Sequence, residues 1–194
     1  MRRLILVRHA VTPGMRRACF PSGEHADPAG LRRAAALAGA FPGLSGVYCS
    51  PEPVATQTLA AAGLRGTVAG ALAAADHGRW SGLPYAQVAA AEPEALRRWR
   101  EDPDAAPHGG ESIASMVRRV SAWLDGQSSL DGTAVVCCDA GPIRAVLARV
   151  LGLDPAAADR IDLAPLSVTR IASAGRGGWR VGGVNGQPRI PDLL

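Results

Sequence analysis

The run Arg3-Leu4-Ile5-Leu6-Val7-Arg8-His9 begins as a continuous apolar segment and ends abruptly in two polar side chains. Uninterrupted apolar runs of this length are typical of strands that are buried on both faces of a parallel sheet. In such sheets, ligands bind at the carboxyl ends of the strands. The pattern therefore predicts a buried strand with Arg8 and His9 in a polar site at its end.

Apolar runs and helical patterns alternate along the rest of the chain. Short apolar runs predict further strands over residues 46–49, 134–138, 168–172 and 179–181. Apolar residues spaced three and four apart, with Ser, Asp or Pro near the start, predict helices over about residues 31–41, 51–63, 112–124 and 142–151. This alternation predicts the α/β class, as a three-layer α/β/α sandwich with a mainly parallel central sheet. The run over residues 134–138 ends on Asp139, so the same rule brings Asp139 near Arg8 and His9 if the two strands are adjacent.

Residues 66–110 do not follow that alternation, and we expect them to form an excursion over the sheet. The side chains predicted to be buried there are Leu72, Trp80, Tyr85, Val88, Leu96 and Trp99. His77 and His108 lie beside glycine or proline in expected loops, without the spacing to a carboxylate or cysteine that a metal site requires. We therefore expect solvated loop histidines, no metal and no cofactor.

The size and hydropathy of the chain limit its organisation. The length of 194 residues, with 47% hydrophobic and 20% charged residues, fits one compact domain over residues 1–194. Apolar stretches such as residues 4–7 and 34–37 are far shorter than the roughly 20 residues of a membrane span. The opening Met1-Arg2-Arg3 leads into a strand-like run rather than into the apolar core of a signal peptide. We therefore expect a cytoplasmic protein with no membrane partner, and we leave a homodimer open.

The charge and cysteine patterns argue against two kinds of binding site. All 21 basic residues are arginine, and the arginine pairs are spread along the chain without interleaved aromatic residues. This favours solvated helix faces, with no nucleic-acid partner. The spacing of the cysteines fits neither a zinc site nor a disulfide framework, which predicts small core residues at Cys19, Cys49, Cys137 and Cys138.

Three segments carry a resemblance to a known family. Residues 6–12, Leu-Val-Arg-His-Ala-Val-Thr, resemble the signature Leu-Val-Arg-His-Gly/Ala-x-Thr of the histidine phosphatase superfamily, the phosphoglycerate-mutase-like proteins. Tyr48-Cys49-Ser50-Pro51, with Gln57-Thr58, resembles the family block Ser-Ser-Pro-x-x-Arg-Ala-x-Gln-Thr, and residues 135–144 resemble its block Val-x-x-His-x-x-x-Ile-Arg. Residues 76–82, 107–112 and 161–167 also follow the family order, so the resemblance covers nearly the whole chain.

The resemblance implies a phosphomonoesterase or a mutase-like phosphotransferase. His9 matches the nucleophile that takes up the phosphoryl group, and Arg8 matches a phosphate-binding arginine. Asp76 matches the acid of one family branch, and Glu111 matches a residue near the pocket. A neutral imidazole can attack phosphorus, a guanidinium neutralises phosphoryl oxygens, and an acid protonates the leaving oxygen. The expected ligand is a small molecule, in the first place a phosphate ester, bound with the help of Arg8, Thr12, Arg16 and Ala140.

Three family positions carry other residues in this chain. Val54 stands where a second arginine is expected, Asp139 stands where a second histidine is expected, and Ala74 stands where many members have a glutamate acid. Two charges about 4 Å apart interact by about 4 kcal/mol at an effective dielectric constant near 20, with the sign set by their charges. A phosphate dianion should therefore bind poorly beside Asp139 unless that carboxyl group is protonated.

These departures leave three functions open. The first is phosphotransfer through phospho-His9, weakened by the changes. The second is a divergent enzyme in which His9 and Asp139 form a catalytic acid–base pair that moves protons on a small metabolite without a phosphate group. The third is a ligand-binding protein that has kept the scaffold and lost the reaction.

Each candidate site residue also has a purely structural interpretation. Asp139 is placed to cap the helix that follows it, and Arg8 is able to pair with Glu111 or Asp139. Asp76 is an ordinary residue for a polar turn. Glu111 precedes a helix, where a carboxylate is favoured by the helix dipole.

Overall fold

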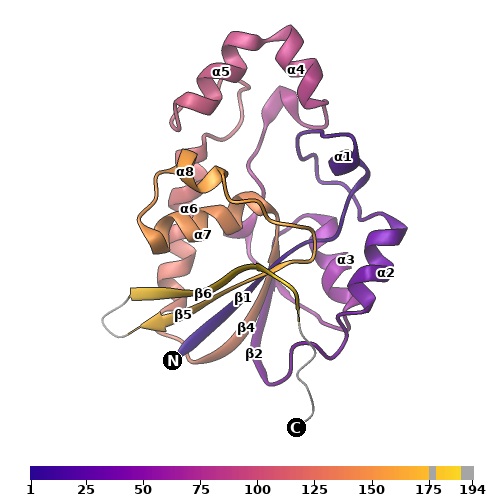
Figure 1. Cartoon of the computed structure of the whole chain (residues 1–194), viewed down its shortest axis with the longest axis vertical. Coiled ribbons are helices and arrows are strands. Elements are labelled where there is room, and N and C mark those ends of the chain that lie inside the picture. Colours follow the sequence, from indigo (N-terminus) through magenta and orange to yellow (C-terminus); the bar gives the residue numbers. More distant parts are fainter. Residues whose placement is uncertain (175–177, 189–194) are drawn as a thin grey trace.

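The central element of the molecule is a six-stranded sheet in the order β3-β2-β4-β1-β5-β6 (Figure 1). The computed structural model describes residues 1–174 and 178–188. Its strands are β1 (Arg2–Arg8), β2 (Leu44–Cys49), β3 (Thr67–Val68), β4 (Gly132–Cys138), β5 (Val168–Ala174) and β6 (Gly178–Gly186). The pairs β1–β4, β2–β4 and β2–β3 are parallel, whereas β5 and β6 add an antiparallel edge. The mainly parallel sheet predicted from the sequence is confirmed.

Helices cover both faces of this sheet (Figure 1). On one side lie α2 (Pro28–Ala35) and α3 (Pro53–Ala61), and on the other lie α6 (Ile113–Gln127) and α7 (Ala140–Leu151), with α8 (Pro155–Asp159) packed on α7. Successive strand residues point to opposite faces. Accordingly, Leu4 and Leu6 pack in the cluster formed with α6 and α7, while Ile5 and Val7 pack in the cluster formed with α3. The three-layer arrangement is therefore confirmed.

The helix starts follow the sequence signals more closely than the helix ends. Asp27 caps α2 by accepting a hydrogen bond from the amide of Gly30, and Ser112 caps α6 by accepting one from Ser115. The predicted helix over residues 31–41 ends earlier, at Ala35. The chain turns there through bonds between residues three apart, and Gly39 adopts a φ of +80° that ordinary helical residues do not adopt. No helix in residues 1–174 and 178–188 has both the length and the apolarity of a membrane span.

After β3, which joins the sheet, the excursion over residues 66–110 continues as a group of short elements. They are η1 (Gly70–Leu72), η2 (Gly78–Trp80), α4 (Tyr85–Ala91) and α5 (Pro93–Glu101), and α4 and α5 lie beyond α1 (Pro13–Arg16) on the side away from the sheet (Figure 1). The predicted burial of Leu72, Trp80, Val88 and Leu96 is confirmed. Tyr85 was expected to be buried, but it is 37% exposed, because its ring stacks on Phe20 and leaves the rest to solvent.

The expectation of solvated loop histidines at His77 and His108 is wrong. Their exposed fractions are only 7% and 1%, because both rings join the aromatic side chains that hold this group together. The His77 ring centroid lies 5.0 Å from that of Phe20, and the His108 centroid lies 4.9 Å from that of Trp80. Burial, together with the neighbouring His108, lowers the pKa of His77 to about 4. This ring is therefore neutral at neutral pH.

The cysteines are free thiols. Cys49, Cys137 and Cys138 lie in the strands and are at most 1% exposed, which confirms them as small core residues. Cys19 differs from them because it lies in the loop after α1 and is partly exposed.

The backbone of residues 110 and 111 lies close to the carbonyl of Asp76, so a larger residue at position 110 should destabilise the fold. The amide of Glu111 donates to the carbonyl of Asp76 over 2.7 Å, and a Cβ atom added at Gly110 would lie 2.2 Å from that same carbonyl oxygen. We expect Gly110→Ala to lower the free energy of unfolding by roughly 1–3 kcal/mol, as overpacking does elsewhere. Thermal unfolding followed by circular dichroism measures the effect, with a shift of roughly 2–4 °C per kcal/mol for a chain of this size.

The matched control is Gly126→Ala, at an exposed position of α6 where an added Cβ meets no atom within 4 Å. Alanine there should stabilise the helix by about 0.5–1 kcal/mol. If the two variants unfolded at the same temperature, the close approach of residues 76 and 110 would be ruled out.

Candidate active site

The register of the sheet brings the predicted strand-end residues together. In the parallel pair β1–β4, Arg8 lies opposite Cys138, and the amide of His9 donates to the carbonyl of Cys138 over 3.0 Å. Asp139 follows Cys138 directly, so its carboxylate lies beside the His9 ring, with 3.5 Å between Nε2 and Oδ1. The two strand ends predicted to lie near each other do meet at this edge.

The His9 ring has a fixed orientation. Its Nδ1 atom lies 2.7 Å from the carbonyl oxygen of Ala10. Because a carbonyl oxygen only accepts hydrogen bonds, we assign a hydrogen to Nδ1. Nε2 is then the atom that faces Asp139. In the neutral ring Nε2 carries the lone pair, and in the protonated ring it donates to the carboxylate.

The charge states of the two side chains depend on each other. Burial disfavours the imidazolium, but the hydrogen bond and the charge of Asp139 outweigh it, so the pKa of His9 is raised. Burial of Asp139 acts against ionisation too, yet His9 and then Arg8 hold the pKa of the carboxyl group well below its usual range. Each side chain therefore stabilises the charged form of the other. Solvent reaches this pair only narrowly, since 7% of the His9 side chain and 17% of the Asp139 side chain are exposed.

Arg8 completes this group from the last position of β1. One terminal nitrogen donates to the carbonyl of Leu163, and Nε lies 4.0 Å from the carboxylate of Asp139. Within the described ranges, Nε is buried and has no hydrogen-bond partner. The ion pair with Asp139 is loose, and among the residues that the structure describes Arg8 makes no pair with Glu111. The Nε–H group of Arg8 is therefore a donor that an anionic ligand would be able to use.

The predicted acids have other partners. Both carboxylate oxygens of Glu111 accept from Arg119, each over 2.7 Å. Asp76 is exposed, and its Oδ1 accepts from the amide of Gly78 over 2.8 Å. In the part of the chain that the structure describes, neither side chain makes a hydrogen bond or ion pair with Arg8, His9 or Asp139. Their roles as proton donors stay predictions.

The predicted substrate-binding residues are also engaged in local structure. Thr12 caps α1 by accepting from the amide of Met15 over 3.2 Å. Arg16 pairs with Asp27 over 2.6 Å and is 60% exposed at its side chain. The amide of Ala140 donates to Asp139 Oδ1 over 2.6 Å, which makes Asp139 the cap of α7 as well as the neighbour of His9. Contact of Thr12, Arg16 and Ala140 with a substrate stays a prediction.

Two polar residues beyond β2 were not singled out from the sequence. The amide of Ser50 donates to the carbonyl of Cys137 over 2.9 Å, which places the end of β2 beside the end of β4. The hydroxyl of Ser50 and one carboxylate oxygen of Glu52 are buried without a hydrogen-bond partner among the described residues. Ser50 and Glu52 both belong to the segment that resembles the Ser-Ser-Pro block of the family. The sequence did not single out Glu52, because a glutamate at the start of a helix is already expected from the helix dipole. Val54, which follows in the first turn of α3, is buried and brings no charge.

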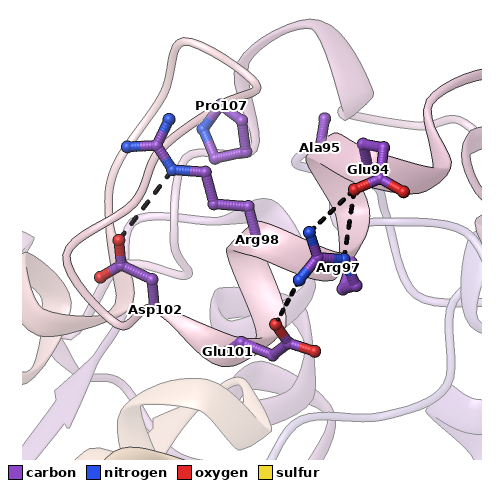
Figure 2. A pocket seen from close by; sticks show the side chains of 7 residues that line it. All are labelled: Glu94, Ala95, Arg97, Arg98, Glu101, Asp102 and Pro107. Atoms are coloured by element: carbon purple, nitrogen blue, oxygen red, sulfur yellow. Dashed lines mark hydrogen bonds and ion pairs between the residues drawn. The ribbon is translucent and has the colours of Figure 1, made fainter.

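Surface hollows lie elsewhere on the molecule, along α4 and α5. Figure 2 shows one of them, which is lined by Glu94, Ala95, Arg97, Arg98, Glu101, Asp102 and Pro107. Arg97 bonds to two of the glutamates and Arg98 pairs with the aspartate, so these charges neutralise one another. None of the predicted site residues lines this hollow or its neighbour.

The sequence of this chain is similar to those of known phosphatases. The model of the histidine phosphatase superfamily (branch 1) matches residues 4–186. A bifunctional protein of Mycobacterium tuberculosis is 31% identical over 194 residues, which cover 92% of this chain and 53% of that protein, so the chain spans about half the length of that relative. Phosphoserine phosphatase 1 of Hydrogenobacter thermophilus is 39% identical over 82 residues, which cover 41% of this chain and 39% of that enzyme.

A solved structure extends the likeness over almost the whole chain. The mycobacterial glucosyl-3-phosphoglycerate phosphatase in complex with VO3 superposes with a TM-score of 0.81 at 26% identity, over 96% of this chain and 100% of that one. Homologues of this chain are therefore phosphatases.

The ion pair predicts a shift in the titration of His9. Replacing Asp139 by asparagine removes the carboxylate charge, while burial of the ring remains, so the pKa of His9 should fall below its value in the parent protein. Nuclear magnetic resonance of the ring carbon and nitrogen signals against pH measures this. Asp131→Asn, at the opposite end of β4 and 86% exposed at its side chain, should leave the His9 titration where it was. An unchanged titration in Asp139→Asn would show that the two side chains are not in contact in solution.

Proposed function

We propose that this chain, which belongs to the histidine phosphatase superfamily, hydrolyses phosphate monoesters through a phosphohistidine at His9. The observation that supports it most directly is the orientation of the His9 ring. The carbonyl of Ala10 fixes Nδ1, and this leaves Nε2 as the reactive atom beside the guanidinium of Arg8 and the carboxylate of Asp139. The phosphatases among its homologues support the same reaction class.

The proposed reaction has two displacements at phosphorus. After His9 has lost its Nε2 proton to solvent, the Nε2 lone pair forms a bond to phosphorus while the ester P–O bond breaks and the leaving oxygen takes up a proton. Water then attacks phosphorus, the P–N bond breaks, and inorganic phosphate and free imidazole result. Arg8 neutralises the phosphoryl oxygens in both steps.

Asp139 slows this reaction in two ways. It favours the imidazolium, which cannot attack phosphorus, and its charge repels a phosphate dianion. The uncharged side chain of Val54 does not offset this repulsion. We therefore propose a phosphatase with slow turnover of simple esters.

The contact between His9 and Asp139 also supports a second candidate function. A histidine paired with a carboxylate at 3.5 Å is suited to shuttle protons on a small metabolite without a phosphate group. The two candidates differ in what they require of Asp139, since the carboxylate hinders phosphotransfer but is essential to an acid–base pair.

Trapping the covalent intermediate tests the first candidate. With p-nitrophenyl phosphate or phosphoserine as substrate, we expect release of inorganic phosphate and, after rapid denaturation, phosphate attached to His9 that mass spectrometry locates. His9→Ala should abolish both signals. His25→Ala, at an exposed histidine that bonds to Gln57, should retain both. Phosphate release that persists in His9→Ala would exclude the phosphohistidine route.

Asp139→Asn separates the two candidates by the sign of its effect. If the carboxylate hinders phosphotransfer, kcat/KM for p-nitrophenyl phosphate should rise by roughly tenfold or more, because a like-charge contact near 4 Å costs up to about 4 kcal/mol. The control Asp131→Asn should match the parent. A loss of p-nitrophenyl phosphate hydrolysis in Asp139→Asn would show that the carboxylate assists the reaction, as an acid–base partner of His9 does, rather than hinders it.

A further inference from the structure

Glu52 follows the end of β2, at the same edge of the sheet as the candidate site. β2 ends at Cys49, which pairs with Cys137 of β4, and β4 in turn pairs with β1, which leads into His9. Neighbouring strands are roughly 4.8 Å apart, so the ends of β2 and β1 are separated by about 10 Å with β4 between them. Side chains that extend from both ends are within reach of one small substrate.

One oxygen of the Glu52 carboxylate is hydrogen-bonded to the backbone of Ala74. Oε1 of Glu52 accepts a hydrogen bond from the amide of Ala74 over 3.0 Å. Ala74 stands where many relatives in the family are expected to carry a glutamate as the acid. The Glu52 carboxylate is therefore held against the backbone of a residue whose own side chain carries no carboxyl group.

The second oxygen of this carboxylate is uncommitted. Oε2 is buried and has no hydrogen-bond partner within residues 1–174 and 178–188. Buried polar atoms are normally hydrogen-bonded, so an exception at a candidate site points to a partner that arrives with the ligand. By contrast, both oxygens of Glu111 are taken up by Arg119, and the carboxylate of Asp76 is exposed and bonded to Gly78.

The charges of Glu52 and Asp139 act on the same buried thiol, that of Cys138. Burial raises the pKa of the Cys138 thiol, and the charges of Cys137, Asp139 and Glu52 raise it further. Both carboxylates therefore act on the residue whose carbonyl binds the amide of His9. Val54, two positions after Glu52, does not provide the cation that an arginine would bring.

We propose that Glu52 is the proton donor to the leaving group, in place of the side chain that is absent at Ala74. This proposal rests on the phosphatase function proposed above. As Nε2 of His9 bonds to phosphorus and the ester P–O bond breaks, the carboxyl proton of Glu52 passes to the leaving oxygen, and an alcohol departs. In the second step the Glu52 carboxylate takes a proton from the attacking water, the P–N bond breaks, and the acid is restored.

The test compares two substrates that differ in their need for a proton. The leaving group of p-nitrophenyl phosphate departs readily as an anion, whereas an alkyl ester such as glycerol phosphate requires protonation. Glu52→Gln keeps an oxygen that accepts from the amide of Ala74, so the local fold is retained, and thermal unfolding checks this. We expect kcat for glycerol phosphate to fall by roughly 100-fold or more, as for other general acids, with KM and the p-nitrophenyl phosphate rate little changed.

A rescue and a control make the outcome specific. In the double variant Glu52→Gln with Ala74→Glu, a carboxyl group returns at the neighbouring position, and turnover of glycerol phosphate should recover at least in part. Glu94→Gln, on the surface of α5, should behave as the parent protein does with both substrates.

The outcomes separate the two proposals. Equal losses on both substrates, or no loss, in Glu52→Gln would overturn the role of Glu52 and leave the phosphatase function standing. A selective loss on glycerol phosphate in Asp76→Asn, with none in Glu52→Gln, would do the same and assign the acid to Asp76. If the parent protein released phosphate from neither substrate, the proposed function itself would fail, and the role of Glu52 with it.

Discussion

The parallel pairing of β1 with β4 is the constraint on which the chemistry of this molecule depends. Its register sets Arg8 against Cys138, so the residues that follow, His9 and Asp139, meet at one edge of the sheet. Because this edge is largely shielded from solvent, each charge there is felt strongly by the other. The imidazole and the carboxylate therefore each favour the charged form of the other.

The architecture was largely predictable from the sequence, because it depends on repeated local patterns. The apolar run of β1 and the caps at Asp27 and Ser112 each act over a few residues, and the structure confirms them. The positions that went wrong depend on contacts between distant segments. His77 and His108 read as loop residues, yet they are buried, since rings from α5 and from the loop after α1 close around them.

The candidate site was predictable only in part, for the same reason. Arg8, His9 and Asp139 end strands, so the sheet rule placed them together in advance. The partners of the acids could not be read from spacing: Arg119 lies eight positions from Glu111, and the amide of Ala74 lies twenty-two positions from Glu52. A carboxylate that is free and one that is held look alike in a sequence, and only the fold distinguishes them.

Asp139 is also the cap of α7, so one side chain contributes to both the helix and the candidate site. A residue at this position that cannot accept a hydrogen bond would give up the cap, at a cost of about 1 kcal/mol. Any change that removes the carboxylate from beside His9 therefore also acts on the stability of the helix that follows β4.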